Sequence, residues 1–303
     1  MQTRHAYGPL VWVDLESPDT KEVRQVAEEF DVAEHIAEEL LHPSSKARSE
    51  FYDRYVYLVM HFPALKHSHA TYEQEVDFII GQNFLITTHY DTIDPLHKFA
   101  KVFEVNAVLG SEPPGEHAGF LFFYTTKKLY KAIEHELDFL RRELTLIEEH
   151  IFHGREVEMV SAISRTARGL LNLRQTIEPH REILRTLEER GPAFFGEDFT
   201  PYLRALSNEY YRVHNHITRA TDSLHELRET NNSLLSTKQN ETMKVFTILA
   251  FVTFPLSLIA SIFSMDTIHD PVVGSPHDFW IVMGIMGVAT IVMFWYFRHK
   301  KWL

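Results

Sequence analysis

The feature that most constrains this chain is a run of nineteen residues without a charge, Val245–Phe263. A helix rises about 1.5 Å per residue, so this run nearly matches the ~30 Å thickness of a bilayer's hydrocarbon core. An uncharged segment of this length is typical of a transmembrane helix. We therefore expect a membrane protein, with the lipid bilayer as one of its partners.

Polar and small side chains follow one face of this predicted helix. They recur at alternating steps of three and four residues, at Thr247, Ala250, Phe254, Ser257, Ser261 and Ser264. Four of the six carry a hydroxyl group, and the larger aliphatic residues occupy mostly the other faces. Because a polar face is unfavourable against lipid, it should pack on another helix or line a water-filled pore. The pattern leaves both alternatives open.

The same face continues toward the N-terminus as a line of polar and acidic residues. Steps of three and four lead to Met243, Asn240, Ser236, Ser233, Glu229, Glu226 and Asp222. Carboxylates concentrate cations, neutral oxygens pass them on, and Phe254 with Met243 would close the path by excluding water. We predict a cytoplasmic cation path at the three carboxylates and a pore lined from Asn240 to Ser261. The alternative for residues 222–236 is a helix face that merely meets water.

A second uncharged run, Phe279–Phe297, predicts a second transmembrane helix. Aromatic residues near both of its ends suit the membrane interface. The tail 298–303 is basic, whereas the connecting segment 264–278 has no Lys or Arg and contains Asp266, Asp270 and Asp278. Since basic residues favour the cytoplasmic side, we expect both termini in the cytoplasm and an acidic external loop. The chain would then be a multi-pass protein of the inner or plasma membrane.

Two membrane helices per chain cannot enclose an aqueous pore. A channel therefore requires several copies around one axis, with the first helix inside and the second outside. The pattern predicts a cyclic homo-oligomer and gives no copy number.

Composition narrows the functional class further. The chain has 303 residues, a net charge of −12 and no cysteine. The lack of cysteine excludes disulfides and thiolate metal sites, and the acidic excess argues against nucleic acid and favours attraction of cations. The first fourteen residues do not resemble a secretory signal, so the soluble part is expected in the cytoplasm.

The N-terminal part is predicted to form a mixed α/β domain. Leu10–Leu15 and Tyr52–Phe62 have the composition of strands, and Val76–His89 is typical of a hairpin that turns at Gly81–Asn83. Helical spacing follows Ser17-Pro18-Asp19 and returns over Asp91–Val108. The scattered histidines lack a compact ligand spacing, so we interpret them as surface or capping residues: His61, His67, His69, His89 and His97.

The C-terminal two thirds are predicted to be helical. One helix is expected over Phe120–His153, and a second over Glu156–Glu189, kinked at Pro179 and stopped at Gly191-Pro192. Acidic residues crowd this pair, which indicates either a cation-attracting face or simply solvated helix surfaces.

A third helix is expected to start with Thr200 as its N-cap and Pro201 in its first turn, and to run unbroken to Phe263. Its apolar residues keep a 3,4 rhythm from Leu203 to Leu234, on a face offset from the polar line. The predicted division of the chain is 1–106 (α/β domain), 107–116 (junction), 117–244 (helical stalk), 245–263 (first membrane helix), 264–278 (external loop), 279–297 (second membrane helix) and 298–303 (basic tail).

These segments together resemble a known family. Thr242–Thr267, the short acidic loop, the second apolar run and the terminal RHKKWL are similar to the CorA family of divalent cation transporters, which includes the zinc-linked ZntB branch. The hairpin and the long helix are similar too, so the resemblance covers essentially the whole chain. It implies a divalent metal ion as substrate and a funnel-shaped homopentamer whose stalk helix continues into the pore. The positions that match the family's pore-facing residues are Asn240, Met243, Thr247, Phe254, Ser257 and Ser261.

The chain departs from the family at its signature. The family has Gly-Met-Asn at the external pore mouth, where this sequence has Ser264, Met265 and Asp266. A ring of five carboxylates would attract divalent cations, and mutual repulsion would raise the pKa of some members. Serine in place of glycine also removes backbone freedom from a tight turn. Asp266 is the predicted metal ligand.

The predicted function is passive, gated transport of a divalent cation, with magnesium as the default ion. Within this class the alternative is zinc or another transition metal such as cobalt or nickel. From a different class, the alternative is a non-transporting membrane protein that senses ions or scaffolds partners. The sequence contains no nucleophile elbow, phosphate loop or His-Glu-x-x-His helix, so we do not expect an enzyme.

Overall fold

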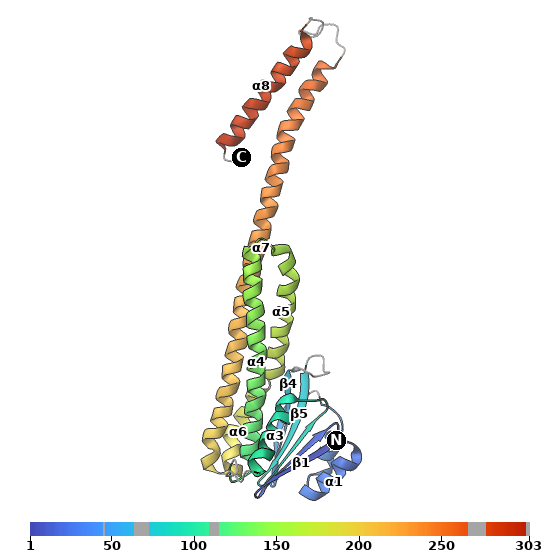
Figure 1. Cartoon of the computed structure of the whole chain (residues 1–303), viewed down its shortest axis with the longest axis vertical. Coiled ribbons are helices and arrows are strands. Elements are labelled where there is room, and N and C mark those ends of the chain that lie inside the picture. Colours follow the sequence, from blue (N-terminus) through green and yellow to red (C-terminus); the bar gives the residue numbers. More distant parts are fainter. Residues whose placement is uncertain (45, 64–72, 109–114, 266–276, 301–303) are drawn as a thin grey trace. The chain divides into compact units, whose positions relative to one another are not determined.

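The computed structural model describes residues 1–44, 46–63, 73–108, 115–265 and 277–300. The chain divides into two compact units, residues 1–228 and residues 229–303. The first unit contains a mixed sheet and a set of packed helices, and the second contains the two most apolar helical segments (Figure 1). The predicted fold class is thereby confirmed: an α/β part, a long helix and two candidate transmembrane helices.

Six strands form one sheet in the first unit. In chain order they are β1 (Gln2–Tyr7), β2 (Leu10–Glu16), β3 (Arg48–Phe51), β4 (Tyr55–Pro63), β5 (Glu73–Gly81) and β6 (Phe84–His89). Their order across the sheet is β1-β2-β6-β5-β4-β3; β2 and β6 run parallel and the other neighbours antiparallel. β4 is buried over its whole length, because helices cover both faces of the sheet, and its sequence is accordingly almost continuously apolar.

The strand predictions are partly confirmed. β2 and the β5–β6 hairpin lie where the sequence placed them. The single strand predicted over Tyr52–Phe62 is wrong at its start, because the chain turns at residues 52–54 and β4 begins at Tyr55. β1 and β3 were not predicted. Both lie at the edges of the sheet, where exposed or half-buried side chains give no apolar alternation.

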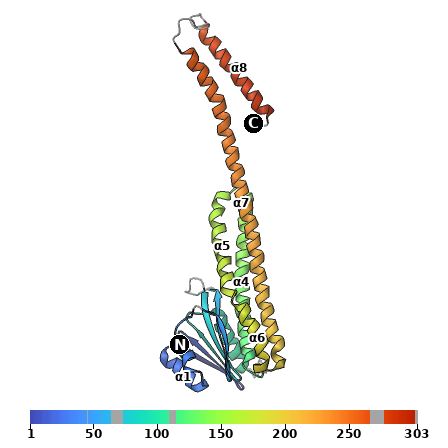
Figure 2. The same cartoon turned by 180° about the vertical axis from the view of Figure 1, so that it is seen from behind.

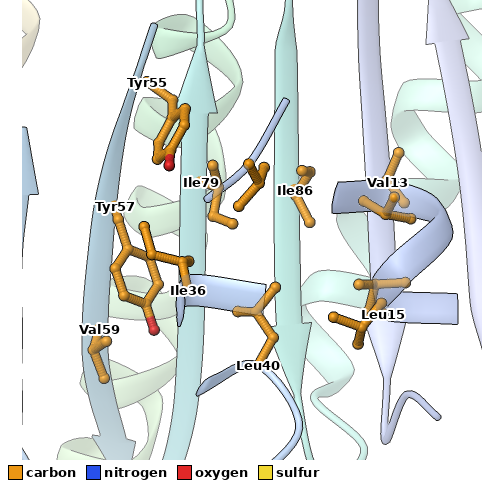
Figure 3. Packing of buried hydrophobic residues seen from close by; sticks show 12 residues of the cluster. Val13, Leu15, Ile36, Leu40, Tyr55, Tyr57, Val59, Ile79 and Ile86 are labelled. Carbon is orange, nitrogen blue, oxygen red and sulfur yellow. The ribbon is translucent and has the colours of Figure 1, made fainter. Parts of the chain in front are cut away.

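Two short helices, α1 (Thr20–Phe30) and α2 (Glu34–Glu39), pack on one face of the sheet. α1 starts with a capping box: Asp19 accepts a hydrogen bond from the Glu22 N–H at 2.8 Å, and the Glu22 side chain accepts one from the Asp19 N–H at 3.1 Å. The core beneath these helices joins α2 to β2, β4, β5 and β6; Figure 3 labels Val13, Leu15, Ile36, Leu40, Tyr55, Tyr57, Val59, Ile79 and Ile86.

The opposite face packs on α3 (Asp94–Val108) and α4 (Gly119–Phe152). Aromatic pairs make these contacts: Trp12 lies 5.6 Å from Phe99, and Phe78 lies 5.2 Å from Phe122, between ring centroids. Fully burying an aromatic side chain removes a large apolar area from water, so these rings fix the helices on the sheet.

The second predicted long helix is in fact two helices, α5 (Glu156–Ile177) and α6 (His180–Phe195), separated at Glu178-Pro179. The predicted stop at Gly191-Pro192 is wrong, because α6 includes both residues. A β-carbon at Gly191 would come within 2.6 Å of Leu203 Cδ1, so glycine here allows close packing of α6 on the next long helix. α6 ends before Gly196, whose φ of 100° is a conformation that favours glycine.

The long helix α7 spans Thr200–Phe263 without a break, as predicted. Its predicted N-cap is wrong: Thr200 has helical dihedrals, a 3₁₀ turn at Glu197–Phe199 precedes it, and its hydroxyl has no hydrogen-bond partner among the described residues. The apolar rhythm is confirmed within the first unit, where its members are buried: Leu203, Leu206, Tyr210, Val213, Ile217, Ala220 and Leu224.

The second unit is a helical hairpin. The C-terminal part of α7 and the antiparallel helix α8 (Asp278–His299) form its two arms (Figure 2). Both helices are long and apolar enough to cross a membrane, and none of the most apolar 18-residue stretch of either is buried in the chain. An apolar helix of a soluble core would be mostly buried, so this exposure favours contact with lipid.

Candidate functional site: a polar face on the first membrane helix

The predicted pore-lining residues all lie on the unbroken helix α7, so helical geometry places them on one face. Most side chains of this face are open: Met243 is 57% and Phe254 74% exposed, and Asn240, Ser257 and Ser261 are also exposed. Thr247 and Ala250 are half-buried. The described residues of the chain therefore leave most of this face uncovered, and its role as a pore lining stays a prediction.

Two hydroxyl groups on this face, those of Thr247 and Ser264, donate to carbonyl oxygens of the chain just before them. The Thr247 Oγ1 donates to the Met243 carbonyl oxygen at 2.8 Å, and the Ser264 Oγ donates to the Ser261 carbonyl oxygen at 2.9 Å. A hydroxyl that donates its hydrogen to its own helix keeps its lone pairs as acceptors. At these two positions the face can thus present neutral oxygens to a hydrated cation without leaving an unpaired donor in an apolar medium.

The opposite side of α7 carries the half-buried aliphatic residues of the second unit. At 100° per residue, Ile248, Val252, Pro255 and Ile259 lie across the helix from the polar face, and all four are half-buried. Between them and the polar face, Phe251 makes a ring contact with Phe297 of α8, at 6.4 Å between centroids. Phe297 is itself buried. Within the hairpin, then, α8 leaves most of the polar face uncovered, and both a helix of another copy and water remain possible neighbours for it.

The predicted cytoplasmic carboxylates continue this face. Asp222, Glu226 and Glu229 are exposed, whereas Leu224 between the first two is buried in the apolar seam of α7. Asp222 and Glu226 belong to the first unit and Glu229 to the second, on the same helix. Their exposure is compatible with a cation path and equally with a solvated helix face.

The structure describes only two of the three residues predicted at the external mouth of the pore. Ser264 and Met265 follow the end of α7 and are exposed. Asp266, the predicted metal ligand, lies outside the described residues. Among the residues that are described, no group of three or more His, Asp or Glu side chains is placed to hold a metal ion. A ring that takes one ligand from each of several copies would not be visible in one chain.

Two of the scattered histidines are buried in the sheet, so their interpretation as surface or capping residues is wrong. His89 is fully buried, and its Nε2 lies 3.3 Å from Asp14 Oδ2. His61 is also buried, with its Nε2 3.2 Å from Glu75 Oε2 and 2.8 Å from the Ser44 carbonyl oxygen. His67 and His69 lie outside the described residues. The sequence did hold a signal for the His89–Asp14 pair. Residues that can form side-chain hydrogen bonds occur at every second position, Trp12 and Asp14 in β2 and Thr87 and His89 in β6.

Within each buried pair, burial and the partner's charge and hydrogen bond shift the pKa values. Burial alone would raise the pKa of Asp14, but hydrogen bonds from His89 and Thr87 outweigh it and hold that pKa below 3.8. Burial would lower the pKa of His89, and the hydrogen bond and charge of Asp14 raise it instead. The hydrogen bond to Glu75 raises the pKa of His61. These groups lie in the sheet of the first unit and stabilise it.

One buried carboxyl has the opposite shift. Burial, and next the charge of Glu75, raise the pKa of Asp77 well above its usual value. Its Oδ1 has no hydrogen-bond partner among the described residues. A buried carboxyl of this kind is more stable with its proton bound.

Ion pairs join α4 to α7. The Arg212 guanidinium donates to Glu134 at 2.6 Å and also contacts Glu209, which lies 3.8 Å from the Lys127 ammonium group. Glu134 and Glu209 are therefore already paired with cations, which makes them structural residues of the packed helices. Glu134 is one of the acidic residues that crowd the predicted helices, and its ion pair with Arg212 favours the interpretation as a solvated helix surface.

The fold and the exposed polar face define a class: a membrane protein with a mixed-sheet soluble part and a hairpin of two membrane helices. The sequence matches the CorA-like Mg2+ transporter protein family over residues 8–299. The chain belongs to this family and is thus a divalent cation transporter of the CorA type.

Similarity to individual proteins of known sequence and structure supports this assignment. The cobalt/magnesium transport protein CorA of Thermotoga maritima is 27% identical over 94% of this chain and 80% of its own length. The complete structure of the CorA magnesium transporter from Methanocaldococcus jannaschii superposes with a TM-score of 0.86, at 18% identity, over 99% of this chain and 94% of that one. The full-length CmaX protein superposes with a TM-score of 0.75, at 16% identity, over 97% and 89%. Likeness at these low identities between structures is a likeness of fold.

Proposed function

We propose that five copies of this chain form a pore for Mg2+ in the cell's inner membrane, lined by the polar face of α7. The observation that carries the proposal is that most of this face, on an apolar helix, is left uncovered within the hairpin, with Ser257 and Ser261 exposed. A hydroxyl-bearing face in the membrane needs water or another polar surface. Copies around one axis supply that surface, with α8 on the outside.

The chemistry of the face suits a cation that keeps its water. Mg2+ gives up hydration water reluctantly, so it is bound through outer-shell contacts to neutral oxygens or carboxylates. The proposed path runs from Asp266 at the external mouth, past Ser261, Ser257 and Thr247, to the exposed carboxylates of the cytoplasmic part of α7. Phe254 and Met243 are its apolar constrictions, where loss of water would close the pore. Both termini lie in the cytoplasm in this arrangement.

The identity of the ion is part of the proposal. The family description and the names of the CorA relatives favour magnesium. CmaX of Pseudomonas aeruginosa, which is named a divalent cation transporter and is 23% identical over 69% of this chain, favours a broader choice. Zinc, cobalt or nickel transport is therefore the second candidate. The substitution of Asp266 for the family's asparagine motivates a third, a protein that binds cations at its mouth and does not conduct.

Flux into proteoliposomes tests the three candidates together. Purified protein is reconstituted, and entry of Mg2+, Zn2+, Co2+ and Ni2+ is followed with an entrapped metal-sensitive dye. We expect Mg2+ entry above that of empty vesicles. Entry of Zn2+, Co2+ or Ni2+ without entry of Mg2+ would refute magnesium as the substrate and support the second candidate. Entry of none, with recovery in Asp266→Asn, would establish the non-conducting form.

Two variants test the polar face itself. Ser257→Leu and Ser261→Leu place bulky apolar groups on the proposed pore wall, and we expect Mg2+ entry to fall by about tenfold or more because the pore loses water there. Leu249→Phe adds bulk at an exposed position that is not three or four residues from any member of the polar face, and should leave entry within about twofold of wild type. Equal losses in all three variants, or a purified particle that native mass spectrometry shows to be a single subunit, would refute the pore.

A further inference from the structure

A groove with a cationic rim lies between α3 and α4 in the first unit, where the two helices pack side by side. Its volume is about 290 Å³. The rim carries Lys98 from α3 and Lys128, Lys131 and His135 from α4, and the floor is apolar. The groove is far in sequence from the polar face of α7 and takes no part in the proposed transport path.

The two helices build the groove in the same way. On α3, the lining residues Pro95, Lys98, Phe99 and Val102 follow the spacing i, i+3, i+4, i+7, and on α4 Lys128, Lys131, Ala132 and His135 follow the same spacing. This spacing places all four residues of each set on one helix face. Phe99 forms a rigid part of the floor, because its ring packs against Trp12.

The lysines of the rim are not neutralised within the part of the chain that the structure describes. Lys98, Lys128 and Lys131 make no salt bridge there, although the chain carries an excess of twelve acidic charges. The neighbouring Lys127, by contrast, lies 3.8 Å from Glu209 and 5.5 Å from the Phe123 ring centroid. Like charges at i and i+3 on a helix repel each other, so an anion bound at Lys128 and Lys131 would relieve this repulsion.

We propose that the α3–α4 groove binds a nucleoside polyphosphate. The phosphate groups contact the ammonium groups of Lys98, Lys128 and Lys131, and the base and ribose pack against Val102, Pro95 and the edge of Phe99. Ammonium groups are common phosphate ligands, and apolar walls with a few placed charges are typical of small-molecule sites. The volume of about 290 Å³ is slightly below the roughly 300–1,000 Å³ of typical small-molecule sites, so part of a nucleoside polyphosphate bound here would stay in solvent.

Binding is measured by isothermal titration calorimetry on the full-length protein in detergent, with EDTA present so that metal binding does not contribute. The probes are ATP, tripolyphosphate and adenosine. We expect ATP to bind with a dissociation constant below a millimolar, and more tightly than either fragment, because it alone contacts both the rim and the floor.

Variants locate the site. Lys131→Gln should weaken ATP binding about tenfold, since a hydrogen bond to a charged group is lost. Lys127→Gln, a change of the same kind one helical turn away and outside the groove, should change it less than twofold. Val102→Asp alters the floor at a side chain that is 53% exposed, so it should retain the wild-type melting temperature while losing ATP affinity.

Several results would overturn the proposal. No heat at ten millimolar ATP, or the same loss of affinity in Lys127→Gln as in Lys131→Gln, would exclude a nucleotide site in this groove. Tripolyphosphate binding as tightly as ATP would reduce it to a phosphate site. A change of oligomeric state in Lys131→Gln, without ATP binding in wild type, would assign the groove to contact between copies. None of these measurements depends on transport, so failure here and failure of the pore are distinguishable.

Discussion

Replacing Asp14 by asparagine should destabilise the first unit by several kcal/mol, because Asp14 is the acceptor at the centre of a buried chain of hydrogen bonds. The Trp12 indole donates to the Thr87 hydroxyl at 2.9 Å, and that hydroxyl donates to Asp14. His89 Nε2 lies 3.3 Å from the other Asp14 oxygen. The side chains of His89 and Asp14 are 0% and 7% exposed, so water cannot replace a lost partner.

Removing one partner of a buried ion pair costs about 3–5 kcal/mol, because the other charge stays buried without compensation. Asparagine keeps an oxygen for Thr87, so we expect about 3 kcal/mol for Asp14→Asn. The loss should depend on pH. The raised pKa of His89 means that its contribution is fully present below pH 6.5 and is lost as pH rises through the folded-state value. The lowered pKa of Asp14 means that its contribution is present above pH 3.8 and is lost as pH falls through the folded-state value.

Chemical unfolding followed by tryptophan fluorescence measures this difference, because Trp12 is part of the cluster. The matched control is Asp31→Asn, the same change in an exposed pair with Arg54, which should cost no more than about 1 kcal/mol. Equal costs for the two variants would refute the argument. So would an Asp14→Asn cost that does not shrink as pH rises above neutrality.

Two further predictions concern the packed helices. His180 is buried between the Tyr130 hydroxyl at 2.9 Å and the His61 carbonyl at 2.8 Å, and burial lowers its pKa to about 4. In the unfolded chain the pKa of His180 is near 6.5, so its neutral, buried form contributes fully to stability above pH 6.5. The free energy of unfolding should then fall by about 3 kcal/mol as the pH drops to 4. Urea titrations should show a weaker pH dependence for His180→Asn. In the same titrations, Leu206→Ala in the apolar seam of α7 should lower the free energy of unfolding by about 2–5 kcal/mol. The control Asn208→Ala, on the exposed face of α7, should lower it by less than about 0.5 kcal/mol. Similar losses in the two variants would contradict the burial of this seam.

The parts of the fold that were predicted correctly are those with a strong periodic signal. The seam of α7 repeats every three or four residues from Leu203 to Leu224, and each member is buried. The β5–β6 hairpin combines two apolar runs with a short turn, and β2 is a short apolar run whose residues are buried except for half-buried Val11 and Glu16. In each case local pattern and tertiary packing favour the same structure.

The errors arose where tertiary contacts outweighed local signals. Gly191 and Pro192 are strong helix breakers by composition, yet α6 continues through them because glycine allows Leu203 to approach and the helix ends three residues later. Thr200 has the composition of an N-cap, but a preceding 3₁₀ turn had already begun the helix. His61 and His89 were interpreted as surface or capping residues because their spacing does not match a metal site, and only the folded sheet brings them to Glu75 and Asp14.

The polar face of α7 shows how far sequence alone could lead. Spacing placed its hydroxyls on one side of a helix, and left open whether that side met a neighbouring helix or water. Within one hairpin, half-buried aliphatic residues such as Val252 and Ile259 lie on the opposite side of the helix, and Ser257 and Ser261 are exposed. Exposure of serine to lipid is unfavourable and exposure to a second copy is not. The pore proposed above, formed by several copies around one axis, would give the serine face the polar surroundings that lipid cannot supply.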